Sequence, residues 1–196
     1  DGLKPRTIKI PADRSPFKRD EHIKETSLEA LSKLPSVFEE KGVQTAGNSC
    51  GIVDGSAAVI VASKETVKKN NLKPLARIVA ATAAGVDPRY MGLGPVPAIR
   101  LLLEITSLKL EDIGLIEINE AFAAQILGCI KELNIDVQRL NINGGAIAIG
   151  HPLAATGTRL ILTLARSMKM RKVRYGIASA CIGGGQGSAI LLELVE

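Results

Sequence analysis

The sequence is poor in aromatic residues and cysteine and has no long apolar run. Aromatic side chains make up 3% of the 196 residues, and tryptophan is absent. The chain therefore has few of the side chains on which single-strand nucleic-acid binders stack bases. Three scattered cysteines exclude a disulfide framework or a Cys-x-x-Cys metal site, which indicates a reducing, intracellular compartment and no bound metal. No segment approaches the roughly 20 apolar residues of a membrane span.

The residues that are present suit a globular enzyme with an anionic ligand. Apolar residues make up 46% and charged residues 23% of the chain, enough to bury a core. The formal charge of +5 comes from basic residues interspersed with acidic ones, which favours a phosphorylated small molecule over nucleic acid. The chain begins with Asp1 and shows no signal-peptide pattern, so we expect a processed chain or a piece of a longer one.

Strand and helix patterns alternate along the chain. Prolines in residues 1–20 predict an extended connector, and residues 25–34 predict a short helix begun by Thr26 or Ser27. The apolar run 56–62 predicts a buried strand. Further strands are predicted at 75–86, 115–118, 175–180 and 188–195, and further helices at 64–70, 98–105, 121–133 and 156–170. This order predicts an α/β fold with a mixed, largely parallel sheet covered by helices.

Three polar residues interrupt this pattern where apolar stretches stop. Asn119 follows Leu-Ile-Glu-Ile, His151 follows Gly-Gly-Ala-Ile-Ala-Ile-Gly, and Cys181 follows Tyr-Gly-Ile-Ala-Ser-Ala. Successive residues of the three lie 32 and 30 positions apart, about the length of one βα unit. Successive parallel strands would therefore bring all three side chains to one sheet edge, where open α/β sheets bind ligands.

Each of these residues also has a structural interpretation. Asn119 could cap the helix over 121–133, His151 could be a loop histidine with a satisfied hydrogen bond, and Cys181 could be a small buried hydrophobe. The position of His151 before a helix favours a neutral ring that can act as a base. The glycines over 183–187 can offer backbone N–H groups as an oxyanion hole, and they lack phosphate-loop or dinucleotide-fold spacing. Together these features suit acyl-thioester chemistry.

Three blocks carry a resemblance to a known family. They are Asn-Glu-Ala-Phe-Ala at 119–123, the Gly-His-Pro block at 144–152 and Cys-Ile-Gly-Gly-Gly-Gln-Gly at 181–187. In this order and spacing the chain resembles the thiolase family of acyl-CoA acetyltransferases, from about residue 20 to residue 196. Met-Gly-Leu-Gly-Pro-Val-Pro-Ala from residue 91 and Ala-Arg-Ile-Val from residue 76 are most similar to mitochondrial 3-ketoacyl-CoA thiolases, with the acetoacetyl-CoA type second.

The resemblance implies catalytic roles for four residues. Cys181 is the acid/base at the acetyl-CoA methyl carbon, and His151 activates a nucleophilic cysteine. Asn119 holds a water that stabilises the enolate oxygen with His151, and the Gly183 N–H contributes to a second oxyanion hole. The acyl group would pass through a covalent thioester, which predicts ping-pong kinetics. Coenzyme A would be a substrate, with no tightly bound cofactor.

The resemblance also implies residues that bind CoA and the acyl group. Ala46, Cys50 and Gly51 would lie near the pantetheine, Phe122 and Met91 would line the acyl pocket or belong to the core, and Lys24 stands where relatives place an arginine on the CoA phosphate. Cys50 replaces the serine usual in the family. We hypothesise that it lies near the CoA sulfur and makes the site sensitive to oxidation.

The nucleophilic cysteine and the loop-domain histidine of the family have no counterpart in this sequence. We therefore expect residues 1–45 to be a connector and remnant of the loop domain, 46–72 the last part of the N-terminal domain, and 73–196 the C-terminal domain. The chain should be inactive without the missing N-terminal half; the alternative is a non-catalytic CoA-binding or assembly subunit. The full protein is expected to be a homodimer or homotetramer, in the mitochondrial matrix of a eukaryote or the cytoplasm of a bacterium.

Overall fold

A four-stranded sheet forms the centre of the computed structural model, which describes residue 20 and residues 22–195. The strand order is β1-β4-β3-β2, with β1 Ala76–Gly85, β2 Leu115–Ile118, β3 Tyr175–Ile182 and β4 Gln186–Leu194. Strands β1 and β3 both pair antiparallel with β4, whereas β2 and β3 are parallel. The connector expected in the first 20 residues lies outside the described residues, except for its last one.

The α/β fold and the mixed sheet are confirmed, but the expectation that the sheet is largely parallel is wrong. The strand–helix alternation holds only as far as β3, because β3 turns directly into β4 through the glycines at 183–185. Gly184 and Gly185 have φ values of 91° and 93°, a region that L side chains rarely adopt. A Cβ at Gly185 would also overlap the Val86 carbonyl oxygen. These glycines make the sharp hairpin possible.

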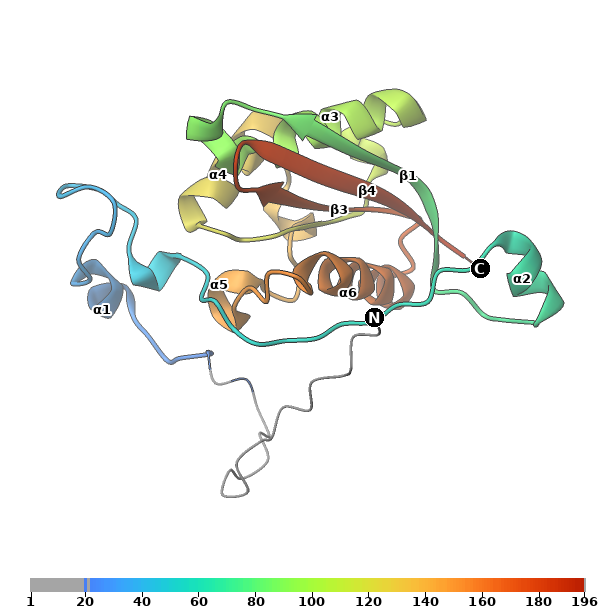
Figure 1. The fold of residues 1–196 in the computed structure, drawn as a ribbon, viewed down its shortest axis with the longest axis horizontal. Coiled ribbons are helices and arrows are strands. Elements are labelled where there is room, and N and C mark those ends of the chain that lie inside the picture. The colour runs from blue at the N-terminus through green and yellow to red at the C-terminus, as the bar shows by residue number, and fades with distance from the viewer. Residues whose placement is uncertain (1–19, 21, 196) are drawn as a thin grey trace, which may run out of the picture.

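Helices cover both faces of the sheet (Figure 1). Helices α3 Pro95–Thr106 and α4 Ala123–Leu133 lie on one face and α6 Thr156–Arg171 on the other. Strand β2 shows why two cores form: Ile116 and Ile118 join the α3 core, while Leu115, of opposite parity, packs with Leu164 of α6. Burying each such side chain contributes about 2 kcal/mol.

Short helices complete the described chain. Helix α1 Leu28–Ser32 is capped by Ser27 and α2 Lys64–Lys69 by Ser63, which confirms helices predicted in these two regions. The remaining elements are α5 Ala146–Ile149 and the 3₁₀ turns η1 Ala46–Asn48, η2 Pro88–Leu93, η3 Leu110–Asp112 and η4 Val137–Arg139. No helix of the described part is both long and apolar enough to cross a membrane.

The buried strand predicted over residues 56–62 is absent. This segment is extended but pairs with no strand of the described chain, and it passes below α5 and α6 in the view of Figure 1. Ile60 is 95% exposed and Val61 75% exposed. The β-branched run has the local preference of a strand, but the surface that would bury it is not among the described residues.

Candidate functional site

Asn119 and Cys181 both lie at the carboxyl ends of the parallel strands β2 and β3, as predicted. Asn119 directly follows β2, and its backbone N–H donates to the Ser179 oxygen at 3.0 Å, which continues the parallel pairing with β3. Cys181 stands two residues further along β3 and pairs with Gly187 of β4. Because β2 and β3 are parallel, their carboxyl ends coincide. The topology therefore brings the amide and the thiol to the same end.

His151 reaches the site by a different route from the predicted one. The residues before it form helix α5, not a strand, and His151 lies in the loop that leads into α6. Its backbone N–H donates to the Gly51 oxygen at 2.7 Å. The loop histidine is thus fixed by a segment 100 residues earlier in the chain.

Residues 49–51 join the separate parts of the site. Ser49 forms an isolated antiparallel bridge with Phe122, and the Cys50 N–H donates to the Ala121 oxygen at 3.0 Å. Gly51 accepts the hydrogen bond from His151. The same short segment therefore contacts both the residues after Asn119 and the histidine.

The His151 ring is oriented by Thr156 and lies in surroundings that lower its pKa. Its Nδ1 lies 2.6 Å from the Thr156 Oγ1, and the Thr156 hydroxyl donates to the Pro152 oxygen at 3.1 Å. Since the hydroxyl has one proton, a Thr156 that donates to Pro152 accepts from Nδ1, and in that tautomer Nε2 is the acceptor. Burial lowers the pKa of His151, and the charge of Arg159 lowers it further. The pKa of His151 shifts in the direction that the sequence analysis expected, but its largest cause is burial and not the helix end.

The three thiols are all in environments that favour the protonated form. Burial raises the pKa of Cys181, a neighbouring Cys50 raises it further, and a backbone hydrogen bond opposes both. Burial likewise raises the pKa of Cys50, and it raises that of Cys129 in α4 to about 11. A nucleophilic cysteine needs a lowered pKa. None of the three has the lowered pKa of an activated nucleophile.

The side-chain amide of Asn119 is buried and makes no described hydrogen bond. The residue is 1% exposed, and neither its Oδ1 nor its Nδ2 has a partner within the described residues. The interpretation of Asn119 as a helix cap is wrong, because Phe122 occupies the N-cap position of α4. A buried amide without partners is costly, so this side chain is available for a group that enters the site.

The other predicted residues lie at different distances from this centre. Phe122 is half-buried and packs edge-to-face against Phe38, with ring centroids 5.9 Å apart. Met91 lies in η2, which packs against α4, and Gly183 is exposed in the β3–β4 turn with open space around its Cα. Ala46 and Lys24 are exposed, and no described contact joins them to His151 or Asn119.

Sequence reasoning missed several residues of the site. Glu117 is 2% exposed on β2, and burial raises its pKa to about 7, against the lowering effect of Arg159. A glutamate inside a four-residue apolar strand was the available signal. His22 packs its ring on Gly51 so closely that a Cβ at Gly51 would overlap it. No local sequence pattern predicts this contact, because only the tertiary structure brings the two residues together.

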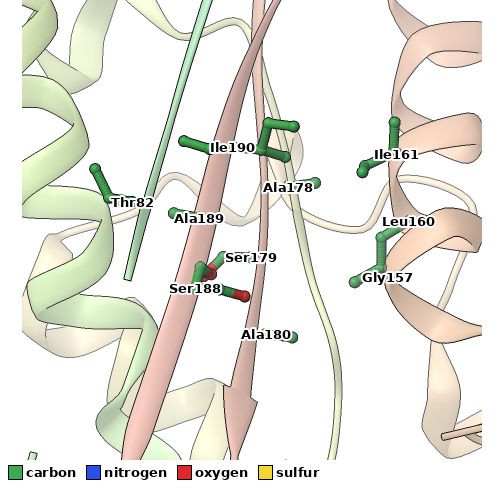
Figure 2. A pocket seen from close by; sticks show the side chains of 11 residues that line it. Thr82, Gly157, Leu160, Ile161, Ala178, Ser179, Ala180, Ser188, Ala189 and Ile190 are labelled. Carbon is green, nitrogen blue, oxygen red and sulfur yellow. The ribbon is translucent and has the colours of Figure 1, made fainter. Parts of the chain in front are cut away.

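A cavity of about 180 Å³ lies between α6 and the sheet. Figure 2 shows Gly157, Leu160 and Ile161 of α6 on one side and Ala178, Ala180 and Ile190 of the sheet on the other. The side chains that line it are small or aliphatic. The cavity therefore offers apolar surface and few groups that could take part in a reaction. Within the described chain no group of three His, Cys, Asp or Glu side chains is placed to hold a metal ion.

Comparison with known proteins identifies the family. The family models described as "Thiolase, C-terminal domain" and "Thiolase, N-terminal domain" match residues 72–194 and 3–65. The chain belongs to the thiolase family. It is 48% identical to the mitochondrial 3-ketoacyl-CoA thiolase of Bos taurus over 192 residues, which cover 97% of this chain and 48% of that thiolase.

Solved thiolase structures share the fold. Human mitochondrial 3-ketoacyl-CoA thiolase in complex with CoA superimposes with a TM-score of 0.90 at 48% identity, over 92% of this chain and 46% of that one. The acetyl-CoA acetyltransferase of Bacillus anthracis gives a TM-score of 0.92 at 46% identity, over 96% and 48%. The chain spans about half the length of the thiolases it matches.

Proposed function

We propose that this chain supplies the acid/base and oxyanion residues of a thiolase that acts on acyl-CoA. The reaction is thiolytic cleavage of a 3-ketoacyl-CoA or, in reverse, Claisen condensation of acetyl-CoA, with CoA as substrate and no tightly bound cofactor. One observation carries the proposal: Asn119 and Cys181 share a sheet edge, and residues 49–51 link that edge to a neutral His151. Thioester enolate chemistry needs an acid/base at carbon and fixed donors at oxygen.

The environments of the site residues match the proposed roles. During cleavage the bond between the α and β carbons breaks, the β-acyl group passes to a cysteine sulfur, and the acetyl-CoA enolate takes a proton from Cys181. The raised pKa of Cys181 keeps that proton on the sulfur until the carbanion forms. The unpartnered Asn119 amide serves the enolate oxygen, through a bound water as in the family. His151 accepts the proton of the nucleophilic cysteine as that cysteine attacks, and returns it when the acyl group leaves. The CoA thiol that attacks the acyl-cysteine gives its proton to the Cys181 thiolate, which restores the Cys181 thiol, and the Gly183 N–H serves the oxyanion.

The acyl-carrying cysteine is proposed to come from the half of the thiolase that these 196 residues do not span. Cys50, Cys129 and Cys181 all have raised pKa values, and none is at the start of a helix. The exposed side chains of Ile52 and Ile60, together with the cavity beside α6, offer apolar surface for that half. By itself the chain should not turn over substrate.

Further features of the proposal follow from the family. Residues 1–45 belong to the connector and loop domain, 46–72 to the end of the N-terminal domain and 73–196 to the C-terminal domain. Ala46, Cys50 and Gly51 contact the pantetheine, Lys24 the CoA phosphate, and Phe122 and Met91 the acyl chain. The complete enzyme is a homodimer or homotetramer, in the mitochondrial matrix or the bacterial cytoplasm according to its source.

Reconstitution tests the proposal. The chain is mixed with the separately expressed N-terminal half of a related thiolase, and thiolysis of acetoacetyl-CoA is measured for the mixture and for each half. We expect activity only in the mixture, and a loss of about 10³-fold or more with Cys181→Ala or Asn119→Ala. A matched control is Ser107→Ala, in the loop after α3. Activity of the isolated chain that disappears in Cys181→Ala would show that the nucleophile is not missing.

A non-catalytic CoA-binding or assembly subunit is the alternative. It predicts that CoA binds to the isolated chain, measured by calorimetry, while the mixture stays inactive although the two halves associate. Association is checked by size-exclusion chromatography, so that a failure to assemble is distinguished from a failure to catalyse.

A further inference from the structure

Buried polar groups without partners lie on two elements that pack together, α6 and β2. Arg159 lies in α6, one turn after Thr156, and its Nε and Nη2 atoms are buried without a hydrogen-bond partner within the described residues. The Glu117 Oε2 on β2 is buried and unpartnered in the same way. Unpaired polar groups inside a protein are costly, so a guanidinium with buried nitrogens that interacts with a buried carboxyl calls for a functional explanation.

Arg159 lies on helix α6, which packs against β2 and carries Thr156. Glu117 has the same parity along β2 as Leu115, which packs against Leu160 and Leu164 of α6, so Glu117 faces α6. Arg159 is three positions after Thr156 and therefore shares its helix face. Thr156 in turn holds the Nδ1 of His151 at 2.6 Å.

The electrostatic effects agree with this placement. The charge of Arg159 lowers the pKa of Glu117 and also that of His151. Among the other groups nearby, Glu120 raises the pKa of Glu117, but its carboxylate is engaged by the Asn141 Nδ2 at 3.0 Å and the Ile147 N–H at 3.2 Å.

The remaining elements around His151 contribute little charge. On strand β3, Ala178 lies opposite Glu117, and the Cys181 thiol has a raised pKa that favours its uncharged form. In the segment 49–51, the Cys50 thiol is uncharged for the same reason. The ring of His22 lies beyond Gly51. In the described surroundings of His151, Arg159 is thus the charged group that acts on the imidazole.

We propose that Arg159 is a positioning residue: its guanidinium, whose Nε and Nη2 are buried one helical turn from the Thr156 that holds the imidazole, disfavours the protonated form of His151. The catalytic importance of this effect rests on the proposed function, since only a neutral imidazole can accept a thiol proton. The effect on the ring itself does not depend on catalysis. Arg159 acts through His151 and not on the substrate.

An NMR titration of the chain tests the inference without any assay of activity. The sequence has two histidines, so His22→Gln assigns the two ring Cε1–H signals, and His22 serves as an internal reference. In Arg159→Gln we expect the pKa of His151 to rise by about half a unit to one unit. Arg159→Lys, which keeps the charge, and Arg166→Gln, on an exposed position of the same helix, should leave it unchanged.

A second variant guards against a folding defect. Arg159→Met removes the same charge and keeps an apolar side chain, so the pKa of His151 should rise in it as in Arg159→Gln, and this holds even if Arg159→Gln does not fold. The inference is overturned if the His151 titration does not move in Arg159→Gln or Arg159→Met, or moves equally in Arg166→Gln. An inactive mixture in the reconstitution assay would refute the thiolase proposal and leave this result standing.

Discussion

The buried carboxyl of Glu117 makes the stability of the chain depend on pH in a defined direction. Its pKa of about 7, against an ordinary 4.5, results mainly from burial. Between these two values the folded chain binds a proton that the unfolded chain has released, so the free energy of unfolding falls as the pH rises. At about 1.4 kcal/mol for each pKa unit, the total loss by pH 8 is about 3 kcal/mol.

Glu117→Gln removes this loss, because the amide keeps the shape of the neutral acid and does not titrate. The variant should match the wild type near pH 4.5 and exceed it by about 3 kcal/mol at pH 8. Urea unfolding is followed by far-UV circular dichroism, since the chain has no tryptophan for fluorescence. Titrating groups that do not interact with Glu117 cancel in the comparison of the two proteins at each pH.

The control is Glu111→Gln, at an exposed position, which should leave the pH dependence of unfolding as in the wild type. A difference between Glu117→Gln and the wild type that stays constant from pH 4.5 to pH 8 would refute the reasoning, because it would show that the carboxyl titrates alike in the folded and unfolded chains.

Two further predictions concern the site. Thr156→Val removes the partner of the imidazole Nδ1, so turnover of the reconstituted enzyme should fall about tenfold or more with KM for CoA unchanged, and Thr156→Ser should restore it; an equal loss in both variants would contradict the orienting role. In native-state alkylation with iodoacetamide, read by peptide mass spectrometry, Cys129 should stay unlabelled because it is fully buried, while labelling of Cys181 accelerates as the pH rises towards its raised pKa. Labelling of Cys129 at the rate of Cys181 would count against the described burial.

The sequence determined the elements and the chemistry that depend on local pattern. The four-residue strand Leu115–Ile118 was predicted with its observed bounds, and the long helix Thr156–Arg171 within one residue, because apolar spacing and glycine or proline boundaries are local properties. Asn119, His151 and Cys181 stood out because each polar side chain follows an apolar stretch. Their residue types are enough to indicate acyl-thioester chemistry.

The tertiary structure decided everything that depends on contacts between distant segments. The glycines at 183–185 could have led into a crossover, and only the pairing of β3 with β4 shows a hairpin. Residues 56–62 have strand preference, yet they stay exposed because burial requires a neighbouring surface. Glu117 and Arg159 lie in separate elements, and the packing of β2 on α6 makes them interact. Electrostatic and packing energies depend on distances in space, and no local pattern records those distances.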